Sequence, residues 1–164
     1  MSMIIRPFRV DEAASYRDIR LECLRMHPEA FGSSFEQEAA HPLAWFEERL
    51  RDNVIFAGFQ DHALLGTVGF TAQLGAKRAH KGMLWGMYVR PAARGSGLAR
   101  GLVEAVLEHA RGRVELVQLT VVAENVVARR LYGSFGFEPY GVEERALKID
   151  GRYLDDVLMA KRLG

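Results

Sequence analysis

The chain lacks the features that mark several common classes of protein. Cys23 is the only cysteine among 164 residues, so no disulfide can form within the chain. Lys and Arg number 22 and Asp and Glu 21, which leaves a formal charge of +1 and no basic field of the kind that drives nucleic-acid binding. No apolar run is long enough to span a membrane or to act as a secretory leader. We therefore expect a cytoplasmic protein with neither a nucleic-acid nor a membrane partner.

Metal-binding patterns are also missing from the sequence. The histidines stand far apart, and none has a second ligand four residues away, as zinc motifs require. We expect no metal cofactor. Cys23 falls on the apolar side of a predicted helix that ends near Met26, which favours buried packing over a nucleophilic role.

The composition is 49% hydrophobic, which over this length supports one core and a single domain spanning residues 1–164. Apolar periodicity and turn residues divide the chain into alternating elements. We predict strands at 3–9, 54–59, 64–71, 83–89, 114–122, 137–148 and 153–161, and helices at 11–26, 42–50, 95–111 and 125–135. This alternation indicates an α/β or α+β fold.

A glycine-containing loop, residues 94–99, joins the apolar strand 83–89 to an amphipathic helix. Its sequence is Arg94, Gly95, Ser96, Gly97, Leu98 and Ala99. Free N–H groups at a helix start, the helix dipole and the lack of Cβ atoms at glycine suit a pyrophosphate. A dinucleotide-binding turn would need a third glycine at position 100, which is Arg100. A Walker loop would need a lysine and a hydroxyl at the end of the loop, and both are absent.

A second motif follows the strand at 114–122. Asn125, Ala128, Tyr132, Gly136 and Phe137 have the spacing Asn-x-x-Ala-x-x-x-Tyr-x-x-x-Gly-Phe. Together with the loop 94–99, which matches the pattern Arg/Gln-x-x-Gly-x-Gly/Ala, this chain resembles the GNAT superfamily of N-acetyltransferases. The two motifs lie within 83–137, and the order of predicted elements extends the resemblance over most of the chain.

The resemblance implies a GNAT fold, with a mixed central sheet of about seven strands and four helices. Strands 83–89 and 114–122 would run parallel and splay apart, which leaves a cleft for the pantetheine arm of acetyl-CoA. The implied acetyl-CoA-binding residues are, in chain order, Met87, Tyr88, Val89, Arg94, Gly95, Ser96, Gly97, Leu98, Ala99, Asn125 and Tyr132. The loop amides would hold the pyrophosphate, while β-like contacts from strand 83–89 and the Asn125 side chain would hold the arm.

The implied reaction is direct attack of a primary amine on acetyl-CoA in a ternary complex, with no covalent intermediate on the protein. Tyr132 matches the family's proton donor to the departing thiolate. Family members often carry a carboxylate in the central strand, but this chain has Trp85, Gly86 and Met87 there. We therefore expect Glu36 to accept the amine's proton, with Glu38 as the alternative.

The acceptor's identity is left open by the sequence. It is either a small-molecule amine or a protein amino group, and we expect its pocket to include residues 26–44, the hairpin 74–81 and the last strands. The protein is expected to be a monomer or a homodimer. The missing carboxylate keeps a second function class in view, a non-catalytic acyl-CoA-binding or regulatory module on the same fold.

Overall fold

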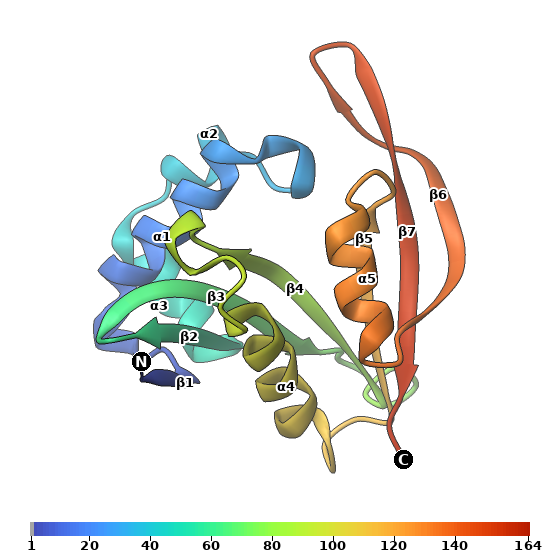
Figure 1. Ribbon diagram of the computed structural model, residues 1–164, viewed down its shortest axis with the longest axis horizontal. Coiled ribbons are helices and arrows are strands. Elements are labelled where there is room, and N and C mark those ends of the chain that lie inside the picture. The colour runs from blue at the N-terminus through green and yellow to red at the C-terminus, as the bar shows by residue number, and fades with distance from the viewer. Residues whose placement is uncertain (1) are drawn as a thin grey trace.

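A single mixed sheet organises the chain. In the computed structural model, which describes residues 2–164, seven strands pair in the order β1-β2-β3-β4-β5-β7-β6 (Figure 1). They are β1 (Met3–Pro7), β2 (Val54–Gln60), β3 (Ala63–Ala72), β4 (Lys81–Val89), β5 (Leu116–Val122), β6 (Glu138–Ile149) and β7 (Arg152–Arg162). Neighbours pair antiparallel except β4 and β5, which run parallel. The expected α/β class and mixed seven-stranded sheet are confirmed.

Helices pack on both faces of this sheet (Figure 1). The α-helices are α1 (Ala13–Met26), α2 (Phe35–Ala39), α3 (Leu43–Asp52), α4 (Leu98–Ala110) and α5 (Val126–Ser134). One core lies between the sheet and the pair α1 and α3, and the other lies between the sheet and the pair α4 and α5. The sequence predicts four helices, and the additional one is α2, which has five residues and is too short to show a periodicity.

The apolar side of α4 is the centre of the larger core. Leu98, Leu102, Val103 and Val106 are completely buried, as the spacing of apolar residues predicts. Gly101 lies where the helix approaches β1, because a Cβ atom there would stand 2.6 Å from Cδ1 of Ile5. The absence of a side chain at Gly101 thus allows the helix to pack closely against this strand.

Two predicted boundaries shift for identifiable reasons. The helix expected from residue 95 begins at Leu98, because Gly95 and Gly97 have φ angles of 77° and 90°, which a helix cannot contain. Asp150 and Gly151 form the turn between the last two strands, and each strand extends one residue closer to this turn than predicted.

The parallel pair β4 and β5 separates soon after it begins. Residues 81–83 of β4 pair with residues 116–118 of β5, and no pairing continues toward the carboxyl ends within the described part of the chain. On its other side, β4 stays paired with β3 as far as Val89. One edge of β4 is therefore free along 84–89, which confirms the expected splayed pair.

The hairpin 74–81 lies at the amino end of β4, whereas the strands separate at its carboxyl end. The expectation that this hairpin helps to form the acceptor pocket is therefore wrong. β4 begins at the hairpin and runs toward the opening between the strands, so the hairpin and the opening lie at opposite ends of β4.

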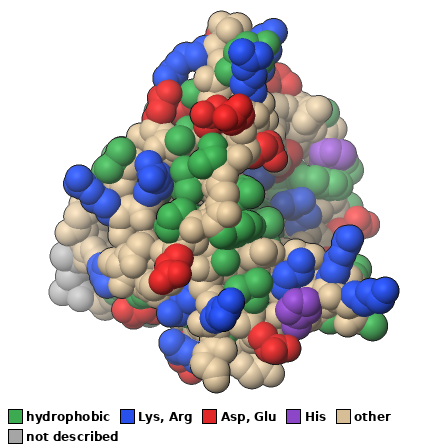
Figure 2. Space-filling model, turned by 90° about the vertical axis from the view of Figure 1, so that its right-hand side faces the viewer, with side chains coloured by type: hydrophobic (Ala, Val, Ile, Leu, Met, Phe, Trp, Pro, Cys, Tyr) green, Lys and Arg blue, Asp and Glu red, His purple; other side chains and the backbone are tan. Residues whose placement is uncertain are grey.

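The outer face formed by β6 and β7 carries both apolar and charged side chains. Figure 2 shows hydrophobic side chains gathered near its middle and charges of both signs around them. Tyr140 and Val142 of β6 are 56% and 58% exposed. The expected choice between monomer and homodimer stays a prediction.

Candidate functional site

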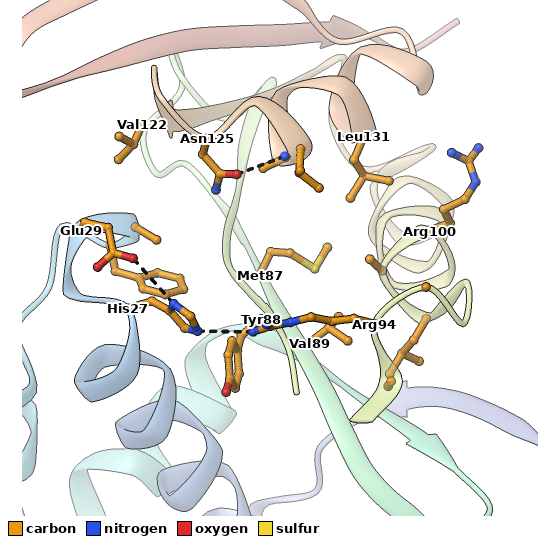
Figure 3. Close-up of a pocket in the computed structure, with 18 of the residues that line it drawn as sticks. His27, Glu29, Met87, Tyr88, Val89, Arg94, Arg100, Val122, Asn125 and Leu131 are labelled. Carbon is orange, nitrogen blue, oxygen red and sulfur yellow. Dashed lines mark hydrogen bonds and ion pairs between the residues drawn. The ribbon is translucent and has the colours of Figure 1, made fainter. Parts of the chain in front are cut away.

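A cleft of about 900 Å³ opens between the separated ends of β4 and β5. Its walls come from β4, the loop before α4, the start of α5, and the segment after α1 (Figure 3). Nine of the predicted cofactor-binding residues line it: Met87, Tyr88, Val89, Arg94, Gly95, Gly97, Leu98, Ala99 and Asn125. The fold thus brings residues from two distant motifs to one cavity.

The free edge of β4 forms the floor of this cleft. Met87 projects into its middle (Figure 3). Gly86 has a φ of 66°, and the pairing of β4 with β3 shifts register in this region, so the strand bulges here. A strand edge without a neighbour presents N–H and C=O groups that can pair with the amides of an extended ligand.

The loop before α4 presents a row of backbone donors. In the described part of the chain, the N–H groups of Gly95, Gly97, Ala99 and Arg100 have no hydrogen-bond acceptor. A Cβ atom at Gly95 or Gly97 would meet nothing within 4 Å, so the space in front of the loop is open. Unpaired donors at a helix start, with the dipole behind them, suit a phosphate group.

Ser96 does not share that role in this structure. It is absent from the cleft lining among residues 2–164, and its N–H donates to the carbonyl of Ala93 at 3.2 Å. Its hydroxyl also donates to Ala93 and accepts a hydrogen bond from the N–H of Leu98. Ser96 therefore braces the loop, while its predicted contact with the cofactor stays a prediction.

Tyr88 faces away from the free edge and joins β4 to α1. Its hydroxyl donates to Glu22 Oε2 at 2.7 Å, and Glu22 is also paired with Arg90 at 3.1 Å. Burial, together with this hydrogen bond to Glu22, raises the pKa of Tyr88 to about 12. Tyr88 is thus a protonated link that fixes β4 against α1.

Asn125 begins α5 on the opposite wall. Its Oδ1 accepts a hydrogen bond from the N–H of Ala128 at 3.2 Å, which caps the helix. The amide nitrogen of the same side chain is directed into the cleft (Figure 3). One oxygen therefore holds the helix start, and the nitrogen is available to a ligand.

Tyr132 lies deeper on the same helix. It is 6% exposed, its ring packs against Phe137 with centroids 5.9 Å apart, and the cleft lining does not include it within the described chain. It follows Ala128, which does line the cleft, by one turn of helix. Burial raises the pKa of Tyr132 above its ordinary value, so the phenol stays protonated at neutral pH.

The two predicted proton acceptors lie away from this cavity. Glu36 is exposed on α2, and Glu38 is buried in a two-bond pair with Arg20, with both N···O distances 2.9 Å. Burial opposes ionisation of Glu38, but the bonds from Arg20 outweigh it and hold its pKa below the ordinary value. Neither carboxylate lines the cleft among residues 2–164. Proton transfer to Glu36 stays a prediction.

Sequence reasoning expects residues 26–44 at the acceptor pocket but does not single out several residues that line the cleft walls. His27, Glu29 and Phe31 come from the segment after α1, and Arg100 and Glu124 come from the starts of α4 and α5. The first three stand in a stretch between helices where no periodicity marks a facing side. Arg100 could have been predicted from its position, because a cation in the first turn of a phosphate-binding helix lies beside the ligand.

No helix within residues 2–164 has the length and apolar character needed to cross a membrane. Over the same residues, no three His, Cys, Asp or Glu side chains converge in a way that would hold a metal ion.

Residues 16–137 match the sequence model of the Acetyltransferase (GNAT) family. The chain belongs to this family. Mycothiol acetyltransferase of Beutenbergia cavernae is 32% identical over 142 residues, which are 84% of this chain and 46% of that protein. The L-amino acid N-acetyltransferase AaaT of Escherichia coli K12 is 26% identical over 98% of this chain and 99% of its own length.

The same fold recurs among solved structures of known and putative acetyltransferases. YncA of Salmonella typhimurium, whose structure holds its cofactor acetyl-CoA, superposes with a TM-score of 0.82 at 22% identity, over 100% of this chain and 95% of that one. At that identity the likeness concerns the fold. The chain spans about half the length of the mycothiol acetyltransferase that it matches.

Proposed function

We propose that this GNAT protein transfers an acetyl group from acetyl-CoA to a primary amine in a ternary complex. The observation that carries the proposal is one cavity that joins three features: the free edge of β4, the unpaired donors before α4, and the Asn125 amide. When bound, acetyl-CoA supplies a thioester whose carbonyl carbon is open to attack by an amine.

The residues present fit acetyl-CoA in shape and in polarity. The loop amides of Gly95, Gly97 and Ala99 would hold the pyrophosphate, and Arg94 would add a cation beside them. The backbone of Met87 and Val89 would pair with the amides of the pantetheine arm, and Asn125 would donate from the facing wall. A cleft of about 900 Å³ is large enough for the arm together with part of an acceptor.

Arg100 is a further candidate for contact with the nucleotide end. It lines the cleft, its guanidinium lies 4.6 Å from the centroid of the Phe135 ring, and Nη1 donates to Ser134 at 3.0 Å. These contacts direct its charge along the outer edge of the opening (Figure 3). A phosphate outside the cleft is the group this position suits.

The acid of the proposed reaction is Tyr132. Its phenol remains protonated at neutral pH and can give a proton to a departing thiolate, whose ordinary pKa is about 8.5. A backbone N–H at the β4 bulge, near Met87, would stabilise the charge that develops on the carbonyl oxygen.

The experiment is a thiol-release assay with acetyl-CoA against a panel of small amines, amino acids and peptides with a free N-terminus. Turnover with one class identifies the acceptor. Tight acetyl-CoA binding without release of thiol for any amine would instead favour the rival function, a non-catalytic acyl-CoA-binding module. Calorimetry on the same preparation separates that outcome from a protein that binds no acetyl-CoA at all.

A further inference from the structure

His27 stands in the cleft at the end of α1, on the side away from α4 (Figure 3). Its side chain is 34% exposed, and the centroids of its ring and of the Tyr88 ring lie 5.8 Å apart. It thus has packing on one side and the cavity on the other. An imidazole nitrogen can accept and release a proton, so the contacts of this ring decide what it can do in the cleft.

The contacts of the ring fix where its proton must be. Nη2 of Arg94 lies 3.3 Å from Nε2 of His27. A guanidinium has only donors, so Nε2 must accept, and a neutral ring then carries its proton on Nδ1. The lone pair of Nε2 therefore accepts a hydrogen bond from Arg94.

The other ring nitrogen faces a carboxylate. Nδ1 of His27 lies 3.6 Å from Oε1 of Glu29, slightly beyond hydrogen-bond length (Figure 3). Contacts between a base and the group that orients it are often long before the substrate binds. An Nδ1–H directed at a carboxylate, with the Nε2 lone pair left for a proton, is the arrangement of an oriented general base.

We propose that His27 accepts the proton of the acceptor amine, that Glu29 orients its ring, and that Arg94 covers Nε2 until acetyl-CoA binds. The inference rests on the proposed acetyl transfer and names the base for it. It assigns the base to the cleft wall, which Glu36 does not line within residues 2–164.

The ammonium nitrogen of the acceptor loses two protons in the proposed reaction. His27 Nε2 takes one proton from the ammonium group and later releases it to water. The amine nitrogen then forms the new C–N bond as the C–S bond breaks, and the sulfur leaves with a proton from Tyr132. The second proton lost by the nitrogen replaces the one that Tyr132 gave up, so one proton is released for each acetyl group transferred.

Arg94 links this base to the cofactor. Its backbone belongs to the loop that would hold the pyrophosphate, yet its side chain extends across the cleft to His27 (Figure 3). A phosphate makes charge-assisted, two-pronged contacts with a guanidinium that a neutral imidazole cannot match. Arg94 therefore leaves His27 when the pyrophosphate site fills, and the base becomes free only when the acetyl donor is in place.

Other charged groups near His27 are already paired with one another. Glu22 of α1 is held by Tyr88 and Arg90, both from the β4 side, so it is not directed at the imidazole. Glu29 and Arg94 are the charged groups that contact the ring directly.

The test compares His27→Ala with His80→Ala, a matched control at an exposed histidine before the amino end of β4, remote from the cleft. Two acceptors of one shape are used, an amine and its β-trifluoro analogue, whose weakly basic nitrogen is already neutral at pH 7. We expect His27→Ala to lower kcat/KM by about 100-fold or more for the basic amine and much less for the fluorinated one. His80→Ala should leave both rates unchanged.

A structural role for His27 would lower both rates by the same factor, and that result would overturn the proposal. Unchanged rates in His27→Ala would overturn it as well. Acetylation of neither amine by the wild-type protein would instead count against acetyl transfer itself, so the two failures are distinguishable.

A second measurement needs neither turnover nor a variant. Long-range ¹H–¹⁵N spectra of the wild-type ring should show the Nδ1–H tautomer for His27, and added CoA should shift the Nε2 resonance as Arg94 departs. An Nε2–H tautomer in the free protein, or an Nε2 resonance that CoA leaves unmoved, would overturn the assignment even if His27→Ala failed to fold.

Discussion

At the scale of single residues, some polar side chains in and around the site are fixed by a charged partner, whereas others have none. Tyr88 and Glu38 are each fixed in hydrogen bonds to a charged partner. The hydroxyl of Tyr132 has no hydrogen-bond partner within the described chain, and although the residue as a whole is only 6% exposed, this oxygen is not fully buried. A hydroxyl that has no partner within the protein and is not fully buried is available to a ligand as a donor.

Tyr132→Phe should lower kcat by about tenfold or more, because it removes a proton donor, while the acetyl-CoA affinity stays unchanged. The ring and its contact with Phe137 remain in the variant, so the fold should be preserved. Steady-state kinetics and calorimetry measure the two quantities.

Tyr16→Phe is the matched control for this change. Tyr16 is also a buried phenol whose hydroxyl has no hydrogen-bond partner among the described residues, and it lies in the other core, beside Phe46. Loss of the Tyr16 hydroxyl should leave kcat unchanged. Equal kcat values for the two variants would assign Tyr132 to packing alone.

At the scale of elements, prediction from sequence succeeds where periodicity or a special backbone angle marks the chain. The buried stripe of α4 follows from Leu98, Leu102 and Val106, and the loop before it follows from its glycines. Residues 26–44 are expected at the acceptor pocket, but His27 and Glu29 could not be singled out, because no local pattern says which side chains of a segment between helices will face a cleft formed by β4 and β5. Such placement depends on long-range packing that one sequence does not encode locally.

Gly97→Val should raise the KM for acetyl-CoA by about tenfold or more, because a side chain at this position enters the space before the loop amides. Gly112→Val is the control, since Gly112 also has a positive φ, 78° against 90°, and equally open surroundings, but lies in the turn after α4. Both variants carry similar strain of about 1–2 kcal/mol. Similar KM values for the two would mean that the loop does not bind the cofactor.

The junction of β1 and α1 depends on one carboxylate. Glu12 accepts two hydrogen bonds from Arg6, both 2.8 Å, and one from the N–H of Arg9. The bonds from Arg6 are the main reason that the pKa of Glu12 falls from 4.5 to about 2. A lowered pKa in the folded protein means a contribution to stability that is complete above about pH 4.5 and is lost as the pH falls through 2.

Glu12→Gln should therefore lower the Tm at pH 7, and the difference from the wild type should narrow as the pH falls toward 2. Calorimetric melts across that range provide the measurement. A Tm difference that is the same at every pH would show that the ionised state of Glu12 contributes nothing to stability.

At the scale of the whole molecule, the sheet consists of two parts that meet over a short distance. One part is β1 to β4 with α1, α3 and α4, and the other is β5, β7 and β6 with α5 (Figure 1). The backbone ladder between them covers three residue pairs, 81–83 with 116–118. Beyond those pairs, the cleft replaces the hydrogen bonds that a continuous sheet would have.

A ligand in this cleft would complete the interrupted ladder and join the two parts. Acetyl-CoA at 100 times its Kd should stabilise the folded protein by about 2.7 kcal/mol, which for a domain of this size raises the Tm by about 5–10 °C. Hydrogen exchange should slow most at residues 84–89, where the free edge of β4 gains partners. Gly97→Val should show a smaller Tm shift at the same acetyl-CoA concentration, and Gly112→Val the full shift. Protection spread evenly over all strands, or confined to α4, would mean that the ligand does not bridge the gap between β4 and β5.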